Sequence, residues 1–251
     1  MEIFLLSVAA FLSGFVDAVA GGGGVIIFPT FLLLGIPVSE IIATSKLVST
    51  AGTTVVAGTF IKKGLPQKEI LVLAIPFTII GALTGAASVL AIPNDFLKPL
   101  VSILIIGVAI YCYLRPSLGI EHTFSGLTRS TKMLTILAAF LLGFYDGFFG
   151  PGTGIFLAFF FVKILGCDFL RATANTKVLN WVSNVVPLIY FLIYGNIRFD
   201  IGVPMLLANI VGGYVGAHAA IAKGSKFIKW IYLTMAILTG LKLVWDFVKI
   251  A

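Results

Sequence analysis

The chain has 251 residues, of which 59% are hydrophobic and only 11% are charged, and its mean hydropathy is +1.12. Soluble domains have roughly 45–50% apolar and about 25% charged residues, so this composition excludes an ordinary water-soluble globule. The net charge of +7 lies mainly in short loops between apolar runs. This is typical of the Lys/Arg bias that orients membrane proteins, so we expect the lipid bilayer, and not nucleic acid, as the partner.

Apolar runs with few or no charges follow one another along the chain. They cover residues 3–20, 25–34, 47–61, 70–91, 99–114, 133–149, 155–162, 178–194, 201–222 and 227–248. A spanning helix needs about 20 mostly apolar residues, so the runs at 25–34 and 155–162 are too short to cross alone. Each follows a glycine-rich break, which predicts half-helices or hairpins. We expect an all-α polytopic membrane protein with about 8–10 membrane segments.

Two parts of the sequence repeat each other. The motif Gly-Phe-Val-Asp at 14–17 recurs as Gly-Phe-Tyr-Asp at 143–146, which is 129 residues later. Ala-Thr-Ser-Lys at 43–46 recurs as Ala-Asn-Thr-Lys at 174–177, 131 residues later, so one two-residue insertion aligns both motifs. The repeat predicts two homologous helical halves. They are a first transmembrane repeat at 1–114 and a second at 133–251, joined by a cytoplasmic linker at 115–132.

Basic residues fall on different loops in the two halves. The loop at 62–68 is strongly basic, whereas its counterpart beginning near Arg198 is nearly neutral. Conversely, the loop at 223–229 is basic and its counterpart at 95–98 is not. The basic loop of one half thus corresponds to a nearly neutral loop of the other half. This predicts inverted-topology repeats, related by a two-fold axis in the membrane plane, and a parallel repeat is the alternative.

The two glycine-rich breaks are candidate parts of a binding site. Glycine costs about 1 kcal/mol relative to alanine inside a helix, so four in succession from Gly21 to Gly24 should end one. Unwound backbone in a bilayer is tolerated where it is buried in protein or lines a wet cavity, and the N-terminus of the next half-helix favours an anion. The predicted substrate-binding residues are Gly22, Gly23, Gly24, Gly152, Thr153 and Gly154. Close helix packing is the alternative role for such glycines.

Lys46 and Lys177 occupy equivalent positions at the start of an apolar run, each after small hydroxyl or amide residues. A single lysine near a helix end can simply reach the membrane interface, but a pair in matching motifs indicates a shared role. An ammonium group with hydroxyls and amides beside it can replace the hydration shell of a small oxyanion. The predicted ligands beside the two lysines are Thr44, Ser45, Asn175, Thr176 and Asn180, and Ser183 and Asn184 add donors on the following turn.

Asp17 and Asp146 are acids embedded in long apolar runs. An ionisable residue at membrane depth is a candidate for function. An ionised carboxylate would repel an anionic substrate and a protonated one would not, so we assign both residues to proton coupling. The alternative, on an equal footing, is that each aspartate caps a broken helix or pairs with a lysine.

The motifs GFVDAVAGGGG, PTFLLLGIP and ATSK in the first half, with GFYDGFFGPGTG and ATANTKVLNWVSN in the second, resemble the TauE/SafE family of membrane transporters, also called the sulfite-exporter family. The resemblance covers nearly the whole chain. It implies a multi-pass carrier in the inner (plasma) membrane of a prokaryote. It also implies that the substrate is sulfite, an organosulfonate or a related sulfur-containing or carboxylate anion. Pro151 and Thr153 stand where the first break has glycines, so the two breaks need not form identical cavities.

These features together predict a secondary transporter of a small anion, and not an enzyme, with no catalytic residue, metal or cofactor, and the resemblance to an exporter family implies export. The nucleotide-binding signature G-x-x-x-x-G-K-[ST] is absent from the sequence, so an ion gradient or the substrate's own gradient should supply the energy. A passive anion channel is the alternative. An intramembrane aspartyl hydrolase, with Asp17 and Asp146 sharing a proton, is disfavoured because both acids occupy matching points of a repeated motif. The sequence leaves the substrate, the direction of transport, the coupling ion and homo-oligomer formation open.

Overall fold

A computed structural model describes residues 2–32, 36–88, 118–195 and 197–250 of the chain. Its regular secondary structure in these ranges is entirely helical. The helices are α1 (Glu2–Ala20), α2 (Gly24–Leu32), α3 (Val38–Lys62), α4 (Lys68–Ser88), α6 (Arg129–Phe148), α7 (Thr153–Lys163), α8 (Phe169–Tyr194) and α9 (Phe199–Ile250). The predicted apolar run at 99–114, the repeat boundary at 114/115 and the loop at 95–98 lie outside the described residues.

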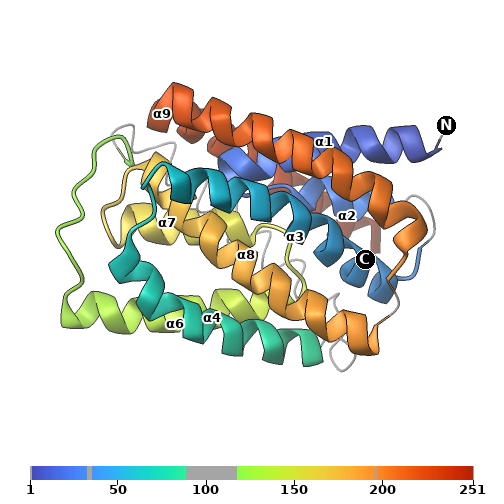
Figure 1. Cartoon of the computed structure of the whole chain (residues 1–251), viewed down its shortest axis with the longest axis horizontal. Helices are drawn as coiled ribbons and strands as arrows, with labels where there is room; N and C mark the ends of the chain where they lie inside the picture. Colours follow the sequence, from blue (N-terminus) through green and yellow to red (C-terminus); the bar gives the residue numbers. More distant parts are fainter. Residues whose placement is uncertain (1, 33–35, 89–117, 196, 251) are drawn as a thin grey trace.

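The helices form a layered bundle. α1 and α9 lie together along one side, α4 and α6 lie together along the opposite side, and α3 and α8 run between them (Figure 1). Six of the described helices are long and apolar enough to cross a membrane: α1, α3, α4, α6, α8 and α9. Many of their bulky apolar side chains, such as Phe4, Val72 and Met133, are exposed, as expected of surfaces that face lipid. The prediction of an all-α, multi-pass membrane fold is confirmed.

Each glycine-rich break separates a long helix from a short one. α1 ends at Ala20, and Gly21 follows with a positive φ of 75° before α2 begins. α6 ends at Phe148, and Gly150 and Gly152 have φ of 94° and 88° before α7 begins. Glycine adopts such angles without the steric cost of a Cβ atom. α2 and α7 have only 9 and 11 residues, so each enters the bundle without crossing a bilayer.

α3 and α8 cross the bundle in opposite directions (Figure 1). Just after α3, the backbone N–H of Gln67 donates to the side-chain oxygen of Asn175, near the start of α8, at 2.8 Å. At the other end, the backbone N–H of Arg198 just after α8 donates to the hydroxyl of Thr44, near the start of α3, at 3.0 Å. The end of each helix therefore lies beside the beginning of the other.

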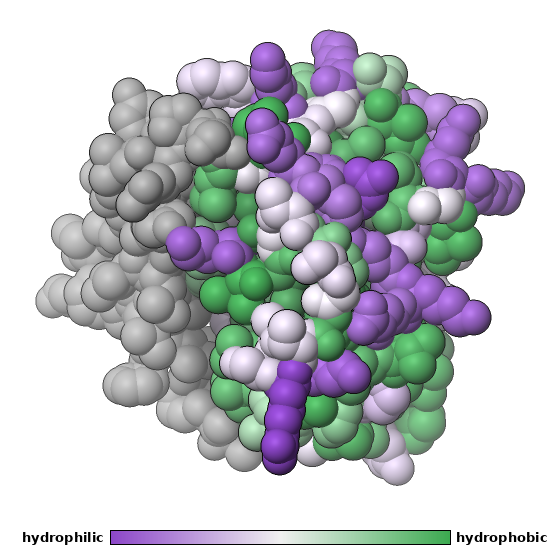
Figure 2. Space-filling model, turned by 90° about the vertical axis from the view of Figure 1, so that its left-hand side faces the viewer, coloured by the Kyte–Doolittle hydropathy of each residue, from purple (hydrophilic) through white to green (hydrophobic). Residues whose placement is uncertain are grey.

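The loop after α3, the linker, the start of α8 and a bend in α9 meet at one end of the bundle, which we call the basic end. There the backbone N–H of Leu127 donates to Glu69 at 3.1 Å, and that of Phe169 donates to the Gly119 carbonyl at 2.8 Å. α9 bends at Gly224, where φ is 69° and ψ is −168°. The exposed basic residues at this end are Lys62, Lys63, Lys68, Arg129, Lys132, Lys163, Lys223 and Lys226. Figure 2 shows hydrophilic side chains gathered over it.

Glycines allow the outer helix pairs to approach closely. A Cβ atom on Gly81 of α4 would fall against the carbonyl oxygen of Phe140 in α6, and one on Gly212 of α9 against that of Phe11 in α1. We expect Gly81→Ala to lower the free energy of unfolding by about 1–3 kcal/mol, because an overpacked contact forces the backbones apart. The measurement is the thermal midpoint in detergent.

The matched control is Gly58→Ala, because Gly58 lies within α3 and a Cβ there would meet no atom within 4 Å. This change should be neutral or slightly stabilising, since alanine is the better helix former. Equal midpoints for the two variants would contradict close packing of α4 on α6.

Candidate functional site

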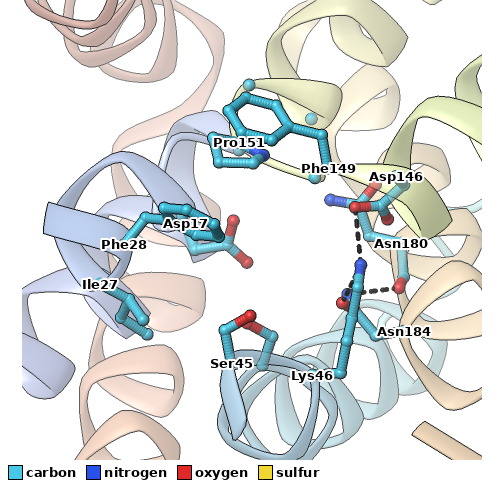
Figure 3. Close-up of a pocket in the computed structure, with 16 residues that line it drawn as sticks. Asp17, Ile27, Phe28, Ser45, Lys46, Asp146, Phe149, Pro151, Asn180 and Asn184 are labelled. Carbon is cyan, nitrogen blue, oxygen red and sulfur yellow. Dashed lines mark hydrogen bonds and ion pairs between the residues drawn. The ribbon is translucent and has the colours of Figure 1, made fainter. Parts of the chain in front are cut away.

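A polar pocket lies where the two glycine-rich breaks meet α3 and α8 (Figure 3). The space within it that is open to water-sized spheres is about 50 Å³. One buried water needs about 10–15 Å³ on this measure, so the pocket has room for a few waters or one small anion. Its lining residues are Asp17, Gly21, Gly24, Ile27, Phe28, Ser45, Lys46, Ser49, Asp146, Phe149, Gly150, Pro151, Gly152, Gly154, Asn180 and Asn184.

Lys46 extends from α3 toward α6 and α8 at the wall of this pocket. Its ammonium donates to Asp146 Oδ1 at 3.0 Å and to Asn184 Oδ1 at 3.1 Å, and its side chain is only 4% exposed. Asp146 also accepts a hydrogen bond from the hydroxyl of Ser183. A buried charge is stable only when it is paired and hydrogen-bonded, so these partners hold the ammonium in place beside the pocket.

A second ion pair is formed by the counterparts of these two residues. The ammonium of Lys177 on α8 donates to Asp17 Oδ2 of α1 at 2.9 Å. Lys177 is fully buried, whereas the Asp17 side chain is 20% exposed and faces the pocket opposite Lys46. Each lysine thus pairs with the aspartate of the other half of the chain. The structure therefore shows each aspartate paired with a lysine, which is the alternative to proton coupling that the sequence left open.

The two breaks touch each other beside the pocket. A Cβ atom on Gly21 would lie 2.6 Å from the Cα of Gly154, and one on Gly24 would lie 3.2 Å from the Cα of Pro151. Any side chain at Gly21 or Gly154 would push these backbones apart. The glycines therefore serve close packing between the breaks, while Gly24, Gly152 and Gly154 also line the pocket.

The residues proposed from the sequence as ligands or proton carriers divide into two groups. Those that line the pocket are Asp17, Gly24, Ser45, Lys46, Asp146, Gly152, Gly154 and Asn180. Those that do not line it are Gly22, Gly23, Thr44, Thr153, Asn175, Thr176 and Lys177. Of this second group, Thr44 and Asn175 bind backbone N–H groups of neighbouring loops, and the Thr153 hydroxyl donates to the Gly150 carbonyl at 2.8 Å.

Several lining residues were not selected from the sequence. Ser49 follows Lys46 by three positions, so the helical period alone could have placed it on the same face. The apolar wall of the pocket could not be predicted from helical spacing, because apolar residues occur throughout the chain. It is formed by Ile27, Phe28 and Phe149, and the rings of Phe28 and Phe149 lie 5.5 Å apart between centroids.

A metal site is not evident in the described ranges, because no three His, Cys, Asp or Glu side chains there are grouped to hold an ion. The polar groups at the pocket are instead an ammonium, hydroxyls, amides and two carboxylates. Such a set suits a small polar or charged solute.

Several known proteins are similar to this chain over nearly its whole length. The family described as "Sulfite exporter TauE/SafE" matches residues 6–243. The chain is 38% identical to the "Probable membrane transporter protein ORF9" of Sinorhizobium sp, over 96% of this chain and 92% of that protein. It is 32% identical to the "Probable membrane transporter protein YfcA" of Escherichia coli strain K12, over 96% and 89% of the two chains. A "Probable membrane transporter protein" of Haemophilus influenzae is 31% identical, over 96% and 94%. No solved structure matches.

Proposed function

Because the chain belongs to the TauE/SafE family of membrane transporters, we propose that it is a secondary carrier that moves a small anion through the pocket at Lys46. It is a multi-pass protein of a bacterial inner membrane, and its activity is membrane transport and not enzymatic catalysis. The observation that carries the proposal is the buried ammonium of Lys46 at the wall of a small polar pocket.

The donors around this ammonium suit an oxyanion. Ser45 and Ser49 place hydroxyls on α3, and Asn180 and Asn184 place amides on α8. Charge-assisted hydrogen bonds from an ammonium are stronger than neutral ones, and the hydroxyls and amides can satisfy the remaining oxygens. The substrate we propose is sulfite, an organosulfonate or a related sulfur-containing or carboxylate anion. The small volume and the description of the family support this choice.

The charges at the pocket support proton coupling. The carboxylate of each ion pair cancels the charge of its own lysine, so an entering anion meets no net positive field. A proton on Asp146 would release Lys46 and remove the repulsion between carboxylate and anion. Anion and proton are then bound together and move together. Asp17, on the opposite wall, is the second candidate for carrying this proton.

The proposed direction is export. An interior-negative membrane potential drives negative charge outward, with about 2.3 kcal/mol for each charge per 100 mV. A dianion such as sulfite that leaves with one proton still carries a net negative charge, so the potential favours its exit, whereas a monoanion that moves with one proton carries no net charge and the potential does not drive it.

The closed inner side of the pocket supports a carrier over a passive channel. Gly21 and Gly154 are in backbone contact beside the pocket, and behind Asp17 the Lys177 ammonium is fully buried. A conducting channel needs a continuous path. In the part of the chain that the structure describes, these contacts lie at the pocket, as a closed state of a carrier requires.

We also propose the predicted organisation into inverted repeats at 1–114 and 133–251, joined by the linker at 115–132. The reciprocal ion pairs, Lys46 with Asp146 and Lys177 with Asp17, support this proposal. So do the antiparallel directions of α3 and α8. If the basic end lies in the cytoplasm, as the Lys/Arg bias indicates, the pocket lies toward the outer side of the membrane, because Lys46 lies in the half of α3 remote from that end.

Binding to the purified protein tests the substrate class. Sulfite, methanesulfonate and acetate are added in excess, and the thermal midpoint is compared with that in the presence of a neutral analogue such as dimethyl sulfone. We expect at least one anion to raise the midpoint, since a ligand that binds only the folded state at 100 times its dissociation constant adds about 2.7 kcal/mol of stability. Stabilisation by the sulfone and by none of the anions would contradict the proposal.

A further inference from the structure

The buried surroundings of Lys177 repeat the chemistry of the open pocket, and we propose that they form a second anion site, shut in this structure, which opens toward the basic end in another state of the carrier. This inference rests on the proposed function. Ser45, Lys46 and Ser49 of α3 line the open pocket. Their counterparts in the repeat are Thr176, Lys177 and Asn180 of α8, which present the same sequence of hydroxyl, ammonium and small polar group.

Two buried polar atoms near Lys177 have no hydrogen-bond partner among the described residues. One is the hydroxyl of Thr176, which does not line the open pocket, and the other is the side-chain oxygen of Asn180, a residue that also lines the open pocket and so lies between the two sites; the two residues are 1% and 5% exposed. Residues four apart share a helix face, so the two side chains lie next to each other along α8. A buried polar atom without a partner destabilises the folded state, because it has lost its hydrogen bonds to water. In a second state an anion could accept from the Thr176 hydroxyl, whereas the Asn180 oxygen, which only accepts, would need a donor such as a water molecule bound with the anion.

Asp17 connects the shut site with the open pocket. One of its oxygens accepts from Lys177, while its side chain lines the open pocket. Asp146 likewise accepts from Lys46 and lines the open pocket. A protonated Asp17 would release Lys177 just as a protonated Asp146 releases Lys46. An anion that leaves Lys46 therefore has the second ammonium, Lys177, on the far side of Asp17.

A pair of hydrogen bonds holds the shut site closed toward the basic end. Asn175, one residue before Thr176, accepts from the backbone N–H of Gln67 at 2.8 Å and donates to the side-chain oxygen of Gln67. Gln67 lies in the loop after α3, at the basic end. The counterpart at the other end is the single bond from the Arg198 N–H to Thr44, beside the open pocket. Opening the shut site requires breaking the Gln67–Asn175 contact.

Cysteine accessibility distinguishes two sites from one. Ser45→Cys and Thr176→Cys are made separately in a chain whose native Cys112 and Cys167 are replaced by alanine, and each variant is reconstituted into liposomes in a known orientation. A membrane-impermeant maleimide is then applied to one face at a time, without substrate. We expect Ser45→Cys to react from the face opposite the basic end, and Thr176→Cys to react from the basic end.

Ala174→Cys is the matched control, because Ala174 is equally buried on the same helix but two positions away, on another face. It should react from neither side. If Thr176→Cys reacts no faster than Ala174→Cys from the basic end, in liposomes that transport sulfite, the second site is overturned and the proposed function stands. If the unmodified protein transports no anion, the proposed function itself fails.

Thr176→Val provides a test that does not need a new cysteine, because valine keeps the shape of threonine and removes only the hydroxyl. We expect a severalfold higher KM for sulfite entering from the basic end and an unchanged KM from the opposite face. An equal change on both faces, or no change on either, would contradict a separate site at Thr176.

Discussion

Replacing Lys46 by glutamine is expected to reduce the kcat/KM of anion transport by about 10- to 100-fold. A hydrogen bond to a charged group contributes about 1.5–3 kcal/mol, and each 1.4 kcal/mol is about tenfold in affinity. Glutamine keeps a donor for Asp146 but removes the positive charge beside the pocket. The measurement is the initial rate of labelled sulfite uptake into liposomes across a range of concentrations.

Lys62→Gln is the control for this change, because Lys62 is an exposed lysine at the basic end of the same helix. It removes the same charge from the chain without touching the pocket and should transport at the normal rate. The thermal midpoints of both variants establish that they are folded. Undiminished transport by a folded Lys46→Gln protein would remove this lysine from the mechanism.

Replacing Lys177 by methionine is expected to destabilise the protein by about 3–5 kcal/mol, because it leaves the Asp17 carboxylate uncompensated inside the bundle. Adding Asp17→Asn should recover part of this loss, since the asparagine carries no charge. Transport should stay defective in the double variant, because both groups belong to the proposed pathway. Thermal midpoints and sulfite uptake, measured on the single and double variants, separate the two effects.

The exposed pair of Arg198 and Asp200, whose atoms lie 2.7 Å apart, is the matched control. Solvent screens the charges of exposed ion pairs, so Arg198→Met should change the midpoint far less than Lys177→Met. A double variant at Lys177 and Asp17 that transports at the normal rate would show that this ion pair is only structural.

The sequence was sufficient to predict the helical membrane fold and the residues that carry charge within it. Composition and run length predicted the spans that the structure describes, and the glycine breaks were located correctly because four successive glycines rarely continue a helix. The beginnings of α3 and α8 were missed. Both lysines lie about two turns inside their helices, and not at the start of a span. The sequence placed them at the start because an uncharged run can be counted only from the residue after the lysine.

The pairing of the charges could not be derived from the sequence. Lys46 meets Asp146 across 100 positions, and Lys177 meets Asp17 across 160. Nothing local distinguishes this exchange between halves from pairing within each half. The sequence also could not show which lysine faces an open pocket, since the two motifs are nearly identical and only the conformation separates them.

The most direct test of a proton-coupled anion carrier is a flux measurement on purified protein in liposomes with an imposed membrane potential. Labelled sulfite, methanesulfonate and acetate are followed together with a pH indicator inside the vesicles. Methanesulfonate is useful because it binds no proton itself near neutral pH. We predict that at least one of the three anions moves, that protons move with it in the same direction, and that Asp146→Asn abolishes the proton movement. Failure of all three anions to cross under any imposed pH gradient or potential would contradict the account.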